Sequence, residues 1–124
     1  MSSNAGRNLR LPPEEYAKRL WDWTDLNVCF ERGIRLTDID GFVEVGNKFL
    51  FLEGKPLGGR LPKGQKIALE RLALLPGVTV IVIEGDPPFD VCGWRVIGKK
   101  RYTGDKDAFK KFIRQWFEWA DKKS

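Results

Sequence analysis

The sequence predicts an α/β domain in which a central mixed β-sheet is flanked by helices, in the order α-β-β-α-β-β-α. Three observations carry this prediction. Apolar residues recur at helical spacing in three segments, two apolar runs flank the turn signal "VGNK", and the apolar run "VTVIVIEG" directly follows a predicted helix. A short, continuous apolar run after a helix is typical of a buried parallel strand.

The composition fits one soluble domain over residues 1–124, since 42% of the residues are hydrophobic and 31% are charged. The net charge of +5 mildly favours polyanionic partners such as nucleic acid. The chain has two cysteines and no histidine, which excludes Ser-His-Asp and Cys-His catalysis and ordinary zinc sites. Any metal site must therefore be built from oxygen, which indicates Mg²⁺, Mn²⁺ or Ca²⁺.

The start of the chain predicts a lead-in followed by a helix. Residues 1–10 are polar, so we expect a flexible lead-in and no signal peptide. The segment "LPPEEYAKRLWDW" predicts a helix, because its prolines suit a first turn and Glu14 and Glu15 suit the positive end of the helix dipole. No apolar run is long enough to span a membrane, so we expect a soluble, intracellular protein of the cytoplasm.

A β-hairpin is predicted next. Residues 34–45 indicate a strand that is interrupted near Gly41, and residues 49–53 indicate its return strand. The turn falls near Gly46 and Asn47. Because "FLFL" is continuously apolar, the return strand is expected to be buried on both faces.

The second half of the chain predicts a helix, two strands and a last helix. The loop "KPLGGRLPKG" leads to the helix "QKIALERLALL" and then to the buried strand "VTVIVIEG". After the turn "DPPFD", residues 91–97 indicate an edge strand with a basic tail, "GKKRY". A helix over residues 105–122 follows, with Asp105 as its cap and Phe109 in its apolar stripe.

Charged residues at one end of the hairpin form the candidate site. Side chains alternate along a strand, so Asp38 and Asp40 are expected to share a face, as are Glu53 and Lys55. In an antiparallel hairpin the start of the first strand lies beside the end of the second, so the two pairs should converge. Three close carboxylates resist ionising together, which Lys55 or a divalent cation would compensate.

The residue types at this end suit a hard metal ion. Asp40, Glu53 and the carbonyl of Gly54 supply three oxygen ligands of the kind that Mg²⁺ or Mn²⁺ takes. Such an ion activates water and neutralises charge that develops on a phosphodiester. Lys55 would then position or deprotonate the water and hold a phosphate oxygen. The alternative interpretation of these charges is an exposed salt-bridge cluster at a sheet edge.

Two further groups flank the cluster. Gln65 heads the apolar stripe of its helix, where a polar group facing the sheet needs a partner; the alternative is a solvated residue at the helix start. Arg60, Lys63 and Lys66 belong to the basic loop and the helix start. These cations either contact substrate phosphates or belong to a solvated loop.

The motif "DIDGFVEVGNKFLFLEGK" resembles the core motif of the PD-(D/E)XK nuclease superfamily. The order helix, hairpin, helix, strand from about Pro12 to Gly85 is similar to the core of that family. The spacing from Asp40 to Glu53 is similar to that in Holliday-junction resolvases, and "GQKIALERL" is similar to a helix of the virus-type replication-repair nucleases, in which a glutamine matches Gln65. The resemblance implies a restriction-endonuclease-like core and a metal-dependent cut that leaves a 5′-phosphate and a 3′-hydroxyl.

The resemblance also implies roles for individual residues. The expected catalytic residues are Asp40, Glu53, Lys55 and Gln65, and the expected metal ligands are Asp40, Glu53 and the Gly54 carbonyl. Neither Asp38 nor Asp40 follows the proline of the family pattern, so Asp38 stays a second candidate, in an outer position or for a second metal. The acid that the family often carries on its first helix corresponds to Glu14 or Glu15.

The sequence therefore predicts a small Mg²⁺-dependent (or Mn²⁺-dependent) endonuclease that hydrolyses DNA, of a structure-specific kind acting on junctions or flaps, with RNA as the other possible substrate. By analogy with the family we expect a phage or mobile-element origin, action in the host cytoplasm if phage-encoded, and a homodimer. One alternative is a catalytically inactive nucleic-acid-binding module on the same fold. Another is an interaction protein that binds no metal. A degenerate site is expected to lose Glu53 or Lys55, and both are present.

Overall fold

The computed structural model describes residues 12, 14–15, 21–56 and 58–122, and it divides the chain into two compact units, residues 1–38 and 39–124. The lead-in predicted over residues 1–10 lies outside the described residues, as does most of the helix predicted over residues 11–23.

In the N-terminal unit, the described residues Glu14 and Glu15 are helical, and the short helix α3 spans Thr24–Asn27. Side-chain hydrogen bonds close the loop that follows this helix. Asn27 Oδ1 accepts from the Leu36 N–H at 2.7 Å, and Trp23 Nε1 donates to Asp38 Oδ1 at 3.1 Å. Asp38 therefore has a structural partner within its own unit.

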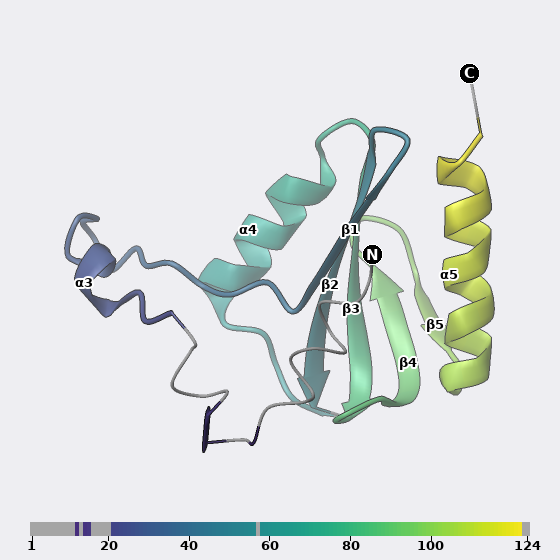
Figure 1. The fold of residues 1–124 in the computed structure, drawn as a ribbon, viewed down its shortest axis with the longest axis horizontal. Coiled ribbons are helices and arrows are strands. Elements are labelled where there is room, and N and C mark those ends of the chain that lie inside the picture. The colour runs from purple at the N-terminus through teal and green to yellow at the C-terminus, as the bar shows by residue number, and fades with distance from the viewer. Residues whose placement is uncertain (1–11, 13, 16–20, 57, 123–124) are drawn as a thin grey trace. The chain divides into compact units, whose positions relative to one another are not determined.

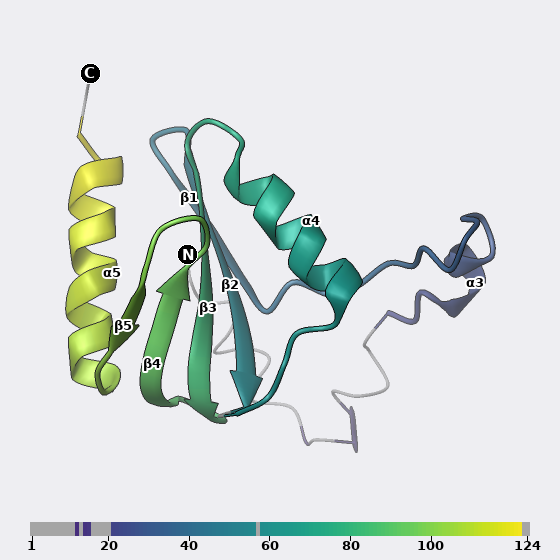
Figure 2. The same ribbon diagram turned by 180° about the vertical axis from the view of Figure 1, so that it is seen from behind.

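The second unit is built on a five-stranded mixed sheet with the spatial order β1-β2-β3-β4-β5 (Figure 1). Its strands are β1 (Gly41–Val45), β2 (Lys48–Pro56), β3 (Val78–Asp86), β4 (Asp90–Val96) and β5 (Arg101–Thr103). Its helices are α4 (Lys63–Ala73) and α5 (Lys106–Ala120). Strands β2 and β3 are parallel and are joined through α4, whereas the other three neighbouring pairs are antiparallel (Figure 2).

The predicted α/β class and the mixed sheet flanked by helices are confirmed, but the predicted order α-β-β-α-β-β-α is wrong. Strand β5 pairs with β4 within the segment that was expected to be a basic tail. Strand β4 is therefore an inner strand and not the predicted edge strand. Three residues are too few to show a strand period in the sequence, so β5 is defined by its partner. The restriction-endonuclease-like arrangement stays a prediction.

The predicted β1–β2 hairpin is confirmed, but its first strand is shorter than residues 34–45. Gly46 and Asn47 form the turn with φ of 55° and 68°, as a two-residue turn between antiparallel strands requires. Residues 34–39 are not part of a strand. Asp40 explains this boundary, because its Oδ2 accepts from the Gly54 N–H at 2.9 Å on the edge of β2 that a longer β1 would have paired.

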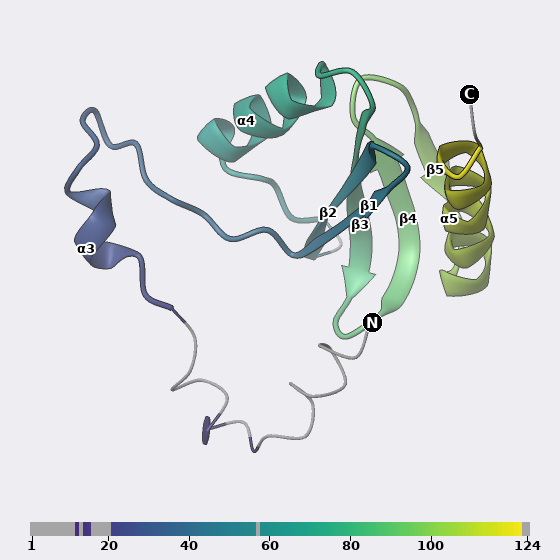
Figure 3. The same ribbon diagram turned by 45° about the horizontal axis from the view of Figure 1, so that its top comes forward.

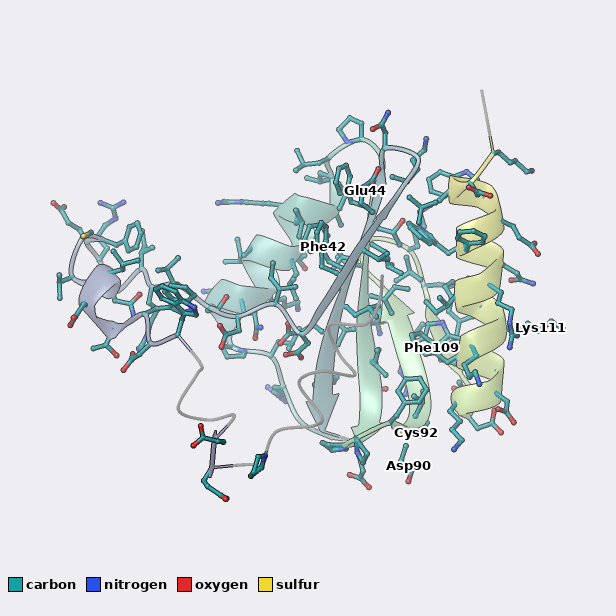
Figure 4. All side chains as sticks on the ribbon, viewed as in Figure 1. Phe42, Glu44, Asp90, Cys92, Phe109 and Lys111 are labelled. Atoms are coloured by element: carbon teal, nitrogen blue, oxygen red, sulfur yellow. The ribbon has the colours of Figure 1, made fainter. Side chains whose placement is uncertain are left out.

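The two faces of the sheet are covered by different helices, α4 on one side and α5 on the other (Figure 3). The face toward α5 carries one buried apolar cluster: Leu50, Ile81, Val91, Trp94, Val96, Phe109, Trp116 and Ala120. Phe109 points from α5 to the sheet in Figure 4 and is 2% exposed. Asp105 caps α5 as predicted, since its Oδ1 accepts from the Ala108 N–H at 3.0 Å.

Side chains on β2 alternate between these faces, which we name the α5 face and the α4 face. Leu50 and Leu52 pack in the cluster under α5, so Glu53 and Lys55 belong to the α4 face. The prediction that residues 49–52 are buried on both faces is only partly right, because Leu50 is buried and its neighbours are half-buried.

Candidate active site

Asp40 lies where β1 begins, and its carboxylate reaches the end of β2. Strand β1 starts with Gly41 opposite Leu52, so the part of β2 beyond Leu52 has no strand on that edge. Asp40 Oδ2 fills this place by accepting from the Gly54 N–H at 2.9 Å. The N–H and the carbonyl of one strand residue point to the same edge, so the Gly54 carbonyl also lies on the Asp40 side of β2.

Glu53 precedes Gly54 and faces α4, where it meets Gln65 in the first turn of that helix. Gln65 Nε2 donates to Glu53 Oε2 at 2.8 Å, and both side chains are half-buried. Gln65 thus has the polar partner that its place on the apolar stripe of α4 requires. An amide donor is neutral, so this hydrogen bond orients the Glu53 carboxylate without neutralising its charge.

Lys55 is fixed at the end of β2 by two contacts. Its register partner on β3 is Glu84, and Lys55 Nζ lies 3.0 Å from Glu84 Oε2. The same Nζ donates to the carbonyl of Gly59, in the loop before α4, at 2.9 Å. The side chains of Lys55 and Glu84 are only 22% and 14% exposed, so solvent ions screen this pair less than a surface pair.

Glu84 is shared between two cations. Its Oε1 accepts from Arg101 Nε at 3.0 Å and also from Arg101 Nη2. The hydrogen bonds from Arg101, and then those from Lys55, lower the pKa of Glu84 below its ordinary value of 4.5, although burial acts in the opposite direction. Glu84 is therefore ionised at neutral pH, and its single negative charge is shared by two cations, which leaves one positive charge in excess.

Gly93 on β4 allows Arg101 to reach Glu84 from β5. A Cβ at position 93 would lie 3.1 Å from Arg101 Nη2 and 3.4 Å from Glu84 Oε1. Arg101 Nη1 also donates to Thr103 Oγ1 at 3.3 Å. The register aligns Lys55, Glu84, Gly93 and Thr103 across β2, β3, β4 and β5. The guanidinium thus crosses β4 where that strand carries no side chain.

A pocket of about 420 Å³ lies at the same end of the sheet. It is formed by the ends of β2 and β3, the start of β4 and the turn that joins β3 to β4. Its charged lining residues are Asp40, Lys55, Asp86 and Asp90, of which Asp90 is labelled in Figure 4. This volume falls in the range of ordinary ligand sites, which is about 300–1,000 Å³.

The structure brings only part of the predicted site together. Asp40 meets Gly54, Glu53 meets Gln65, and Lys55 lies two residues further along β2 than Glu53. The remaining candidates divide into two groups. Arg60, Lys63 and Lys66 are exposed, in the loop before α4 and in its first turn. Asp38, Glu14 and Glu15 belong to the N-terminal unit.

The prediction that Asp38 shares a strand face with Asp40 is wrong. Residues 34–39 do not form a strand, so the alternation rule does not apply to Asp38. Its carboxylate instead accepts a hydrogen bond from Trp23.

The metal ligands suggested by the sequence have hard oxygen donors. No three His, Cys, Asp or Glu side chains gather closely enough to hold a metal ion in the part of the chain that the structure describes. Asp40 and Glu53 supply two carboxylates, and the third proposed ligand is the main-chain oxygen of Gly54. This donor set fits Mg²⁺ or Mn²⁺ that takes its other ligands from water and a substrate phosphate, and it does not form a cage of side chains.

The sequence prediction did not include Glu84 or Arg101. Turn chemistry at the end of an apolar strand sufficed to explain Glu84. The available signal was a carboxylate at the end of "VTVIVIEG" and an arginine in "GKKRY". The two residues are 17 positions apart and meet across β4, so no local pattern connects them.

No protein-family model, curated protein or solved structure matches this chain. No helix within the described residues is both long enough and apolar enough to cross a membrane. The functional argument therefore depends on the residues and their contacts.

Proposed function

We propose that this chain is a metal-dependent endonuclease of the PD-(D/E)XK type that hydrolyses DNA phosphodiester bonds, with RNA as the other possible substrate. One observation carries the proposal: the Asp40 carboxylate, Glu53 and Lys55 all lie at the end of β2, each fixed by a different partner. Asp40 is fixed by the main chain of β2, Glu53 by α4, and Lys55 by β3. Such fixed orientation is what a catalytic group needs.

Asp40, Glu53 and the Gly54 carbonyl would hold Mg²⁺ or Mn²⁺. An ion bound there supplies activated water and neutralises charge that develops on the phosphate. Gln65 keeps the Glu53 carboxylate oriented through its amide. Lys55 lines the same pocket as Asp40 and Gly54, and its ammonium would donate to a phosphate oxygen or to the attacking water.

We name the end of β2, with Asp40, Glu53 and Lys55, the catalytic corner. The cations beside this corner support a polyanionic substrate. Lys55 Nζ donates to the Gly59 carbonyl, so the corner is tied to the loop that carries Arg60 and leads to Lys63 and Lys66. We assign phosphate contacts to these three exposed cations. Structure-specific cleavage of junctions or flaps, a homodimer, and a cytoplasmic, phage-type setting remain predictions from the resemblance.

A cleavage assay with a metal panel tests the proposal. Labelled junction, flap, duplex and single-stranded DNA, with an RNA strand beside them, are incubated with the protein and Mg²⁺, Mn²⁺, Ca²⁺ or EDTA. We expect cleavage with Mg²⁺ or Mn²⁺, little with Ca²⁺ because its looser coordination positions water poorly, and none in EDTA. Undiminished cleavage in EDTA would exclude the metal-dependent mechanism.

Variants then connect any cleavage to this site. Asp40→Asn and Glu53→Gln should each abolish cleavage and calorimetric Mn²⁺ binding while the protein stays folded. Asp38→Asn is the matched control and should have the mildest effect. The Asp38 carboxylate is bonded to Trp23, and both residues belong to the N-terminal unit. If Asp38→Asn removes Mn²⁺ binding and Asp40→Asn does not, the choice of Asp40 as the metal ligand is wrong, and the proposed nuclease function is retained.

The ion pair of Lys55 favours one second candidate function. Lys55 Nζ is bonded to both Glu84 and Gly59, which is also how a purely structural lysine would be held. In that case the chain is a nucleic-acid-binding module without catalysis. Binding of the DNA panel without cleavage under any metal would select this alternative.

A further inference from the structure

The hairpin formed by β4 and β5 has a positive excess. It carries four cations, Arg95, Lys99, Lys100 and Arg101, and its one carboxylate is Asp90 at the start of β4. Lys100 differs from the others, because its Nζ lies over the Tyr102 ring, 5.1 Å from the ring centroid. The other three, Arg95, Lys99 and Arg101, are exposed, and we name them the hairpin cations.

Arg95 and Arg101 lie directly opposite each other in the β4–β5 register. Their neighbours in sequence, Trp94 and Tyr102, are also opposite each other and pack in or against the cluster under α5, so both arginines belong to the α4 face. Like charges on directly opposed residues destabilise a sheet. Stability alone therefore does not explain this pair.

Only one of the two arginines has an acidic partner within the described residues. Arg101 is bonded to Glu84, and Arg95 makes no salt bridge there. Glu84 is already shared with Lys55, so the surface keeps a positive excess. An anion bound from outside would relieve the repulsion between the two arginines.

The hairpin cations adjoin the proposed catalytic corner. Glu84 joins Lys55 and Arg101, whose guanidinium crosses β4 over Gly93. Arg101 is additionally held by Thr103, and its side chain remains 41% exposed. A fixed guanidinium fork that still faces solvent is suited to a phosphate oxygen pair.

Among the described residues, neither α4 nor α5 is packed on this part of the α4 face. Helix α4 contacts β3, and α5 contacts β4 from the opposite side (Figure 3). On this face of β4 and β5, the side chains of Arg95 and Arg101 are exposed.

We propose that the hairpin cations bind the sugar–phosphate backbone of a nucleic acid strand that extends from Lys55 across β4 and β5. This inference rests on the proposed function for the position of the scissile phosphate at Lys55. The contacts are to phosphates and read no bases, since the side chains that define this surface are cations. Binding through them is therefore insensitive to sequence and falls with rising salt.

Salt-dependent binding in EDTA tests the surface without any cleavage. Fluorescence anisotropy of labelled duplex and single-stranded DNA is measured from low to high salt for the parent, Arg95→Ala/Lys99→Ala and Lys110→Ala/Lys111→Ala. The control pair carries the same loss of charge on α5, where Lys111 points away from the sheet in Figure 4. Circular dichroism and thermal unfolding establish that all variants are folded.

We expect the slope of log K against log salt to become shallower only in the hairpin variant. The change should be about 0.9 per cation on duplex and about 0.7 per cation on single strands. The variant Arg95→Lys/Lys99→Arg keeps both charges and should retain the parent slope. If the alanine variant does not fold, Arg95→Gln/Lys99→Gln replaces it, because glutamine changes the shape of the side chains less. The charge-retaining variant is then its control.

The outcomes separate this inference from the proposed function. A shallower slope in the hairpin variant supports the surface whether or not the parent cleaves DNA. If the parent cleaves DNA and the hairpin variant has an unchanged salt slope, the inferred binding surface is wrong and the proposed nuclease function is retained. An equal change of the salt slope in the hairpin and α5 variants also overturns it, because the loss of net charge alone then explains the change. Binding to phosphatidylserine vesicles that depends on the hairpin cations, without nucleic acid binding, overturns it in favour of a membrane surface.

Discussion

The two faces of the sheet differ in chemistry where β2 and β3 end, although both are apolar at their centre, with Val80 and Val82 buried on the α4 face. On the α5 face, Leu50, Ile81 and Trp94 are buried beneath α5. On the α4 face, the next positions toward the ends of β2 and β3 carry Lys55 and Glu84. Strand alternation allows this division, because a change on one face does not alter the other.

The difference indicates that the two faces serve different purposes. Burial of apolar area stabilises the fold, whereas charges removed from water cost free energy unless they are paired. Three charges on the α4 face, those of Lys55, Glu84 and Arg101, stand at one end of the sheet and are paired across strands, whereas Arg95 has no acidic partner among the described residues. A fold that needed only stability would extend the apolar face instead, so we attribute this corner to function. The following variants test that distinction.

The largest expected effect on stability comes from the α5 face. Phe109→Ala removes a side chain that is 2% exposed and whose ring centroid lies 5.1 Å from that of Trp94. The cavity should lower the free energy of unfolding by about 3–5 kcal/mol, as measured by urea denaturation. Phe117→Ala is the matched control on the same helix, where the side chain is 48% exposed, and it should cost much less. Equal losses would show that α5 does not bury Phe109 as described.

Lys55→Ala should have the opposite profile, with a large effect on chemistry and a smaller one on folding. We expect the single-turnover rate of cleavage to fall about 10²-fold, which corresponds to roughly 2.7 kcal/mol, while Mn²⁺ binding is retained. Lys48→Ala is the control, since it removes the same charge from the other end of β2. A Lys55→Ala variant that cleaves like the parent would show that Lys55 takes no part in the cleavage.

Glu84→Gln tests whether the paired charges also contribute to stability. The variant leaves Lys55 and Arg101 without their carboxylate, and we expect a loss of about 2 kcal/mol at neutral pH in denaturant unfolding. Glu118→Gln, on an exposed part of α5, should be nearly neutral.

The pH dependence of the Glu84 effect follows from the direction of its pKa shift. The pKa of folded Glu84 lies below the ordinary value of 4.5, so the stabilisation is complete above that value and is lost as the pH falls toward the folded pKa. The difference in unfolding free energy between the parent and Glu84→Gln should therefore be constant near neutral pH and shrink below pH 4.5. A difference that stays constant at acidic pH contradicts the assigned ion pairs.

The smallest expected effects belong to the loop before α4 and its first turn. Lys63→Ala and Lys66→Ala should each make the salt dependence of DNA binding shallower by about one unit without a change in stability. Both residues are exposed, so their removal leaves no cavity. An unchanged slope in both variants would exclude this segment from the interface.

Local patterns in the sequence determined most of the elements of the second unit. The turn at Gly46 and Asn47, the helix before the apolar run, the parallel strand and the Asp105 cap each depend on residues close together in the chain. Such features follow from backbone preferences and apolar periodicity, which are properties of short segments. The position of Gln65 at the head of an apolar stripe likewise predicted a polar partner, and Glu53 is that partner.

Tertiary structure alone decided the rest. Strand β5 exists because β4 offers it an edge, β1 begins at Gly41 because Asp40 takes the N–H of Gly54, and Glu84 acquires its role from Lys55 and Arg101. The side-chain contacts of Asp40 and Glu84 join residues 14 to 29 positions apart in the chain. The physical reason is that strand register and the path of a long side chain across a neighbouring strand are set by the packing of the whole sheet, which leaves no periodic trace in the sequence.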